Sequence, residues 1–68
     1  MDINLLRQYY PKGTRIQCIH MNDPFNPIPS GTKGEVDYID DLGTIHMLWD
    51  NGSCLGLIPD EDEFIIIP

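Results

Sequence analysis

The sequence predicts a small all-β domain, a five-stranded antiparallel barrel with a short N-terminal helix. Three observations lead to this prediction. Short apolar–polar alternations recur along the chain, tight turn sequences separate most of them, and one long proline-rich loop follows the first. A chain of 68 residues has room for one domain. We expect the helix within residues 1–10 and the barrel within residues 14–67.

The helix is expected at the N-terminus, where Asp2 is a suitable capping residue. Ile3, Leu6 and Tyr10 follow at helical spacing. Pro11 ends the helix, because the residue before a proline is disfavoured in the helical conformation. A helix of about two turns is not stable alone, so we expect it to dock on the barrel.

The first strand is expected over residues 14–21, where Ile16 and Cys18 alternate with polar residues. Residues 22–31 then form a long, stiff loop that contains three prolines. Phe25 and Ile28 are the large apolar side chains of this loop, and two arrangements stay open for them. They either form a binding surface or fold back and cap the end of the barrel.

The second and third strands are expected over residues 34–38 and 44–49, joined by a turn at residues 40–43. In the second strand, the alternation predicts that Val36 and Tyr38 point inward, with acidic residues outward.

The next turn, Asp50-Asn51-Gly52, is the strongest hairpin signal in the chain and allows two registers. A two-residue turn would pair Trp49 with Cys54, whereas a three-residue loop would pair it with Ser53. We favour the longer loop because it gathers four apolar residues on one buried face. These residues are Ile45, Met47, Leu55 and Leu57.

A short turn over residues 58–62 leads to the last strand at residues 63–67. A long connection after the first strand and a short turn before the last are both typical of an SH3-like barrel, which is therefore the expected form. The run Ile65–Ile67 cannot point all three side chains into a single-faced core. At least one should lie under the helix or at an interface, so a homodimer stays open.

Charge and composition narrow the class of partner. Eleven carboxylates against four Lys and Arg give a net charge of −7, which leaves few cations to neutralise phosphates. No apolar run is long enough to span a membrane, and no signal-peptide pattern is present. Two cysteines without a CxxC pair indicate free thiols in a reducing compartment. We expect a cytoplasmic protein whose partners are proteins.

The sequence predicts no catalytic or metal site. The zinc candidates are Cys18, His20, His46 and Cys54. The favoured register turns Cys18 inward but His46 and Cys54 outward, so the four cannot converge. The acids at residues 37–41 and 60–63 lack the ligand spacing of a calcium loop. Cys54 and His46 share a face without a third group to orient the histidine. We therefore predict a protein that is not an enzyme and has no cofactor.

Three segments resemble a known family: residues 21–34, 41–46 and 49–59. They contain the strings MNDP, IPSGTKG, DLGTIH, WDNGS and LGLIP. The combination is similar to small bacterial proteins grouped as a domain of unknown function, and the resemblance covers residues 11 to 67. It implies an SH3-like barrel and a setting in Gram-positive bacteria and their phages, plasmids and conjugative elements. It implies no activity and brings no catalytic residues.

The preferred function is a non-catalytic protein-interaction module, an accessory factor of a bacterial mobile element or phage. The candidate contact residues are Asp23, Pro24, Phe25, Pro27, Ile28, Pro29 and Trp49. Prolines restrict the loop, so little conformational entropy is lost on binding. Trp49 is included because indole is favoured at interfaces, although a tryptophan entering a hairpin is commonly a core residue.

Two other functions stay open. An acidic inhibitor could occupy the nucleic-acid site of a host nuclease or defence protein, which the net charge of −7 motivates. Direct nucleic-acid binding would require Arg7, Lys12, Arg15 and Lys33 to share one face, and the overall charge disfavours it.

Overall fold

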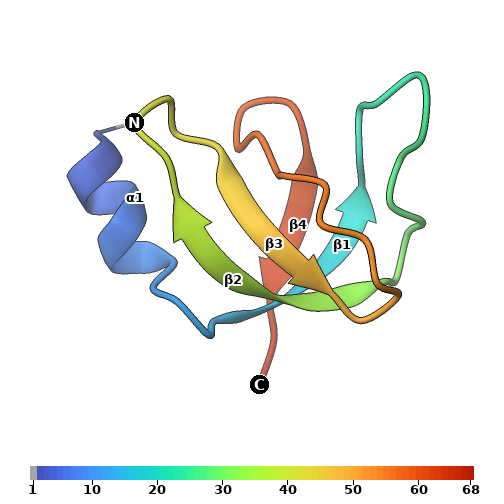
Figure 1. Cartoon of the computed structure of the whole chain (residues 1–68), viewed down its shortest axis with the longest axis horizontal. Coiled ribbons are helices and arrows are strands. Elements are labelled where there is room, and N and C mark those ends of the chain that lie inside the picture. The colour runs from blue at the N-terminus through green and yellow to red at the C-terminus, as the bar shows by residue number, and fades with distance from the viewer. Residues whose placement is uncertain (1) are drawn as a thin grey trace.

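The computed structural model describes residues 2–68, which form one short helix and four strands (Figure 1). The elements are α1 (Ile3–Tyr9), β1 (Arg15–His20), β2 (Lys33–Ile39), β3 (Ile45–Trp49) and β4 (Glu63–Ile66). The helix and these four strands lie at their predicted places in the chain. Within the described residues, no helix has the length and apolar character needed to cross a membrane.

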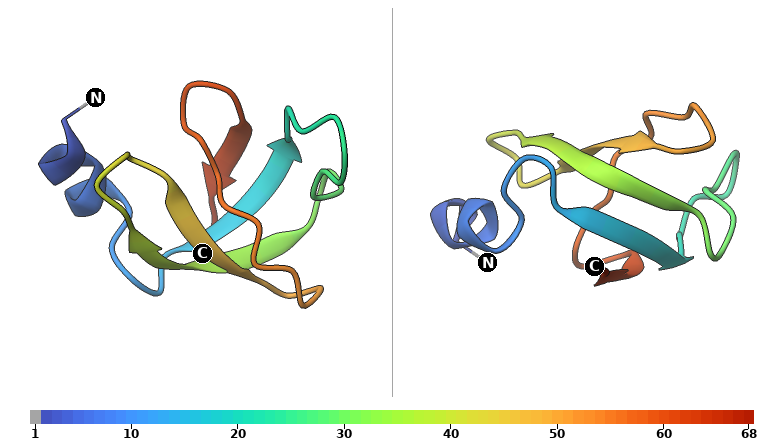
Figure 2. Two further views of the ribbon diagram at one scale, coloured as in Figure 1. Left: turned by 45° about the horizontal axis from the view of Figure 1, so that its top comes forward. Right: turned by 90° about the horizontal axis from the view of Figure 1, so that it is seen from below.

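The four strands form one open antiparallel sheet in the order β3-β2-β1-β4. Figure 2 shows that this sheet is strongly twisted and that α1 lies beside the turn that joins β2 and β3. The connection from β3 to β4 runs across one face of the sheet. Because β1 pairs with β4, the loop that follows β1 lies close to the connection that precedes β4.

The expected five-stranded barrel is not what the structure shows, because the segment after β3 forms an isolated bridge rather than a strand. Ile45 and Leu57 exchange backbone hydrogen bonds of 2.9 and 2.8 Å. Leu55, between this bridge and the turn, bonds elsewhere: its N–H donates to Ser53 Oγ at 3.2 Å, and its carbonyl accepts from Trp49 Nε1 at 2.8 Å. Both bonds divert the backbone of Leu55 from the ladder, so the fifth strand does not form.

The three-residue hairpin loop after β3 is confirmed. The Gly52 N–H donates to the carbonyl of Trp49, and the Trp49 N–H donates to the carbonyl of Ser53, both at 3.0 Å. Gly52 has a φ of +89°, a left-handed conformation that glycine adopts without a Cβ clash. The resulting register buries Ile45 and Met47 on the face that the sequence pattern predicted.

The predicted inward orientation of Tyr38 is wrong, because β2 contains a bulge. Val36 pairs with Met47, but the next pair is Tyr38 with His46, so one residue of β2 has no partner. The extra residue turns Tyr38 outward, where it is 54% exposed and its ring stacks on His46 at a centroid distance of 4.3 Å. Ile39 takes the inward place and is buried.

The core lies between the sheet and the segments that cross it. Its buried side chains are Leu6, Ile16, Cys18, Met21, Ile28, Val36, Ile39, Ile45, Met47, Trp49 and Leu57. β4 contributes less, because Phe64 is only partly buried while Ile65 and Ile66 are 49% and 55% exposed. The isoleucine run therefore keeps apolar surface exposed at an outer strand of the sheet.

The helix docks near the end of β2 through Leu6 and Arg7. Asp2 caps its N-terminus with a 2.8 Å hydrogen bond, as predicted. Leu6 is buried in the core. The Arg7 guanidinium donates to the carbonyl of Ile39 at 3.0 and 3.3 Å and forms an ion pair with Asp41. These contacts supply the tertiary support that a two-turn helix needs.

Gly34 lies where β2 and β3 approach most closely, which leads to a stability prediction. A Cβ at Gly34 would lie 2.8 Å from Trp49 Cε3 and 2.9 Å from both Trp49 Cα and the Leu48 carbonyl oxygen. Two of these are backbone atoms, so no side-chain rotation relieves the clash. We expect Gly34→Ala to lower the free energy of unfolding by about 1–3 kcal/mol. Urea unfolding followed by circular dichroism measures this.

The exposed loop residue Ser30 provides the control for Gly34. Ser30→Ala should change the free energy of unfolding by less than about 0.5 kcal/mol. Equal stability of Gly34→Ala and Ser30→Ala would contradict the close approach of the two strands.

Asp40 organises the turn between β2 and β3. Its carboxylate lies 2.8 Å from His46 Nε2 and accepts hydrogen bonds from the N–H groups of Thr44 and Leu42 at 3.0 and 2.9 Å. The His46 contact, followed by the backbone bonds, lowers the pKa of Asp40 below its ordinary value. The folded protein therefore favours the ionised carboxylate more than the unfolded chain does.

The lowered pKa of Asp40 predicts a pH dependence of stability. Its contribution is fully present above the unfolded pKa of about 4 and is lost as the pH falls through the lower folded pKa. We expect Asp40→Asn to flatten the fall in the urea midpoint on acidification from about pH 5 to about pH 2. Superimposable acid profiles for the native protein and the variant would show that Asp40 makes no such contribution.

Candidate functional site

The proline-rich loop after β1 is held in place by its own polar groups and by one buried side chain. The Asp23 carboxylate accepts hydrogen bonds from the N–H groups of Phe25 and Asn26 at 2.9 and 3.4 Å. Ile28 is 4% exposed, and its N–H lies 3.3 Å from the Met21 sulfur. Phe25, three residues before it, is 92% exposed. Ile28 therefore points into the core, whereas Phe25 points into solvent.

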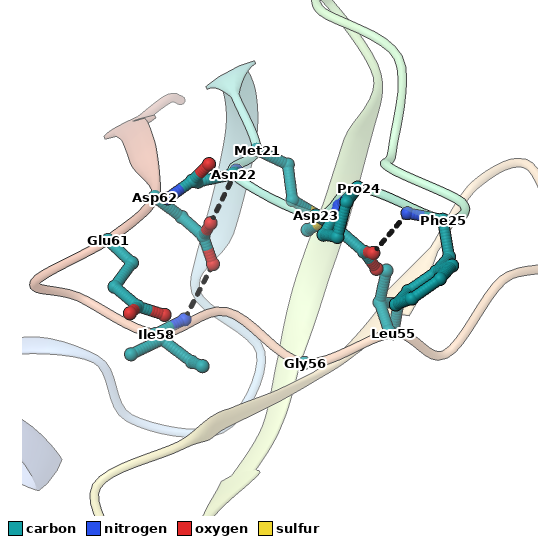
Figure 3. Close-up of a pocket in the computed structure, with 10 residues that line it drawn as sticks. All are labelled: Met21, Asn22, Asp23, Pro24, Phe25, Leu55, Gly56, Ile58, Glu61 and Asp62. Atoms are coloured by element: carbon teal, nitrogen blue, oxygen red, sulfur yellow. Dashed lines mark hydrogen bonds between the residues drawn. The ribbon is translucent and has the colours of Figure 1, made fainter.

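Asp62 connects this loop to the chain segment that precedes β4 (Figure 3). One of its carboxylate oxygens accepts from the Asn22 N–H at 2.9 Å, and the other accepts from the Ile58 N–H at 2.8 Å. Only 9% of Asp62 is exposed. Two residues 36 positions apart are therefore fixed to a single buried carboxylate.

An open groove with a volume of about 310 Å³ lies between the two connected segments. One wall comes from the loop, and the other comes from the chain between β3 and β4. The lining residues are Met21, Asn22, Asp23, Pro24, Phe25, Leu55, Gly56, Ile58, Glu61 and Asp62. Figure 3 shows Phe25 near Leu55 at one end of the groove, with Glu61 and Asp62 toward the other.

Charge is distributed unevenly around the groove. Three ion pairs, Arg7–Asp41, Lys12–Asp37 and Arg15–Asp50, have N–O distances of 3.0, 3.7 and 2.7 Å. None of these six residues lines the groove. Residues 60–63 are four consecutive acids, and within residues 2–68 none of them forms an ion pair. Of these acids, Glu61 and Asp62 line the groove. Glu61 and the exposed Asp60 and Glu63, which lie close to it in the sequence, are termed the acidic rim.

The groove lies within a domain that matches a known family. Residues 1–67 match DUF4314, a domain of unknown function. The chain belongs to the DUF4314 family. No curated protein and no solved structure matches it. The match agrees with the predicted resemblance to a domain of unknown function, and it also includes the N-terminal helix.

The DUF4314 structure separates the predicted contact residues into three groups. Asp23, Pro24 and Phe25 line the groove. Pro27 and Pro29 are exposed but lie outside its lining. Ile28 and Trp49 are each 4% exposed, so they support the surface from beneath. Trp49 acts through its indole N–H, which donates to the carbonyl of Leu55 and fixes that part of the opposite wall.

Sequence reasoning did not include the second wall in the candidate site. The sequence pattern predicts Leu55 in a strand and residues 58–62 as a short turn, with no role in binding. The decisive feature is the contact from Asp62 to Asn22, which joins residues 40 positions apart. Nothing in local spacing distinguishes Asp62 from its acidic neighbours, so this contact was not predictable from the sequence pattern.

The residues considered for catalysis or zinc binding are dispersed in the fold. Cys18 is buried and Cys54 is exposed. Burial, and to a lesser degree the charge of Asp62, raise the pKa of the Cys18 thiol, which favours the unreactive protonated form. His46 contacts Asp40 and the Tyr38 ring. Across the described part of the chain, no three His, Cys, Asp or Glu residues are grouped closely enough to hold a metal ion.

The geometry of Asp62 leads to a prediction for the groove. Asp62→Ala removes the acceptor from two partly buried N–H groups, and we expect a loss of about 1–3 kcal/mol in the free energy of unfolding. The Asn22 and Ile58 amides should also exchange faster with deuterium. Asp60→Ala, on an exposed residue of the same turn, should change stability by less than about 0.5 kcal/mol. Equal stability of the two variants would show that Asp62 does not hold the walls together.

Proposed function

We propose that this domain is a non-catalytic protein-interaction module that binds its partner in the groove, with Phe25 as the anchor. The supporting observation is the 92% exposure of Phe25 at the edge of an apolar groove. Covering a phenylalanine side chain is worth about 1.5–3 kcal/mol, and this chain does not gain that contribution by itself. Aromatic side chains that fill pockets on a partner commonly dominate the energy of binding.

The rigidity of the loop supports the same role. Pro24, Pro27 and Pro29 restrict its backbone, the Asp23 carboxylate fixes the turn at Phe25, and Asp62 holds the start of the loop. A side chain presented on a fixed backbone loses less conformational entropy on binding than one on a free loop.

The arrangement of reactive groups supports a non-catalytic role. Nucleophilic catalysis needs a nucleophile next to a base. The exposed thiol belongs to Cys54, whereas His46 is engaged by Asp40 and Tyr38. The other thiol, Cys18, is buried in the core.

We further propose that the sheet is a partly opened SH3-like barrel in which residues 53–57 take the place of the fifth strand. The bridge between Ile45 and Leu57 puts this segment beside β3, and a turn at residues 58–61 precedes β4. The resemblance noted for the sequence supports a bacterial mobile element or phage as the setting, with the domain as an accessory factor in the cytoplasm.

A second function, an acidic inhibitor at a nucleic-acid site, is favoured by one observation. Asp60, Glu61 and Glu63 are exposed and form no ion pair within the described chain, so their charge is available to a basic surface. A charge-dominated complex would weaken steeply with rising ionic strength, because screening limits electrostatic reach to about 8 Å at physiological salt. Direct nucleic-acid binding has less support, because Arg7, Lys12 and Arg15 are already in ion pairs.

The proposed function predicts the behaviour of Phe25→Ala. The tagged protein is used to capture partners from nuclease-treated native cells, with washes at low and high salt. We expect a protein partner to be retained by the native chain and lost with Phe25→Ala. Because Phe25 is 92% exposed, the free energy of unfolding should change by less than about 0.5 kcal/mol.

Leu42 provides a matched control for Phe25. Its side chain is 91% exposed, but it lies in the β2–β3 turn, at the opposite end of the molecule from the proline-rich loop (Figure 1). Leu42→Ala should retain the partner. Equal capture by the native chain and both variants would refute the groove as the binding site. Unfolding of Phe25→Ala would instead show that Phe25 is structural.

A further inference from the structure

We infer that the groove binds a linear protein segment in which an apolar side chain is flanked by Lys or Arg. The inference rests on the proposed function and specifies the chemistry of its partner. It comes from the shape of the groove, from the state of its hydrogen-bond donors and from the distribution of charge around it.

The shape favours a linear segment. The groove is open and bounded by two stretches of chain, residues 21–25 and 55–62. A volume of about 310 Å³ accommodates a few side chains rather than the surface of a folded domain. Apolar groups from Met21, Leu55 and Ile58 line it, and Phe25 adds an exposed aromatic face at one end. An apolar side chain of the partner would therefore be covered on several sides.

Four backbone hydrogen-bond donors in or next to the walls already donate to carboxylates of the same chain. The N–H groups of Asn22 and Ile58 donate to Asp62. The N–H groups of Phe25 and Asn26 donate to Asp23. A phosphate or carboxylate ligand would find these donors occupied and two anionic groups nearby, so the groove disfavours anions. A cationic ligand would instead find carboxylate oxygens as acceptors.

The charge at the rim favours cations on the partner. Glu61 lies in the lining and Asp23 lies in the other wall. Asp60 precedes Glu61 in the turn, and Glu63 begins β4 two residues after it. Asp60, Glu61 and Glu63 make no side-chain hydrogen bond or ion pair within residues 2–68. Lys or Arg beside the apolar anchor of the partner could therefore pair with these acids without breaking an internal contact. Aromatic faces such as that of Phe25 also attract Arg and Lys.

The test is a selection of random twelve-residue displayed peptides against the full chain, followed by fluorescence anisotropy with the strongest synthetic binder. We expect enriched peptides to carry an apolar residue with Lys or Arg within about three positions on either side. We expect Asp60→Asn/Glu61→Gln/Glu63→Gln to weaken the binder about tenfold, the combined effect of losing three exposed charge pairs.

A charge-matched variant separates the local effect from that of net charge. Glu35→Gln/Asp37→Asn/Asp41→Asn also removes three negative charges, from residues that do not line the groove. It should bind the peptide within about twofold of the native chain. Equal weakening by both triple variants would overturn the inference, because it would show that overall charge, not the rim, attracts the peptide.

The same experiment distinguishes failure of the inference from failure of the proposed function. Enrichment of uncharged or acidic peptides that still depend on Phe25 would overturn the basic partner but support the groove as a binding site. Enriched peptides that bind Phe25→Ala as well as the native chain would overturn both. An absence of enrichment would overturn the inference that the partner is a linear segment. The capture experiment with Phe25→Ala would then still test the proposed function.

Discussion

The Asp62 carboxylate is the contact on which the architecture of the groove depends. Its two oxygens accept the backbone N–H groups of Asn22 and Ile58, which belong to different walls. Burying a carboxylate is costly unless its oxygens receive hydrogen bonds, and both do here. The pairing of β1 with β4 brings the two walls together, and Asp62 then fixes their relative position. The proline-rich loop and the segment that leads into β4 are therefore held in fixed positions relative to each other.

A second side-chain contact explains why the sheet stays open. The Trp49 indole donates to the carbonyl of Leu55, and Ser53 Oγ accepts the Leu55 N–H. The N–H and the carbonyl of Leu55 would otherwise form hydrogen bonds with β3. The chain thus gives up a fifth strand and gains a wall whose apolar side chains face the groove. In a small domain, where few core residues are available, Trp49 both fills the core and positions the surface above it.

The sequence pattern predicts the parts of this fold that local rules control. Gly52 and the alternation around Ile45 and Met47 were sufficient to choose the hairpin register, because burial allows one of two faces. Tyr38 was misplaced because a bulge adds a residue without any sequence signal that outweighs alternation. The proline-rich loop was recognisable as one wall, but its partner wall depends on side-chain bonds from Asp62 and Trp49. Such long-range contacts carry no local periodicity.

The contrast between Phe25 and Ile28 indicates how a domain this small can keep an aromatic side chain exposed. A 68-residue chain has a small core, so the simplest way to stabilise the loop would be to bury both residues. Only Ile28 is buried, while hydrogen bonds to Asp23 and Asp62 supply the remaining order. Ile28 and the two carboxylates thereby stabilise the loop, whereas Phe25 contributes little to its stability. Under the proposed function, the exposed ring of Phe25 is reserved for a contact with the partner.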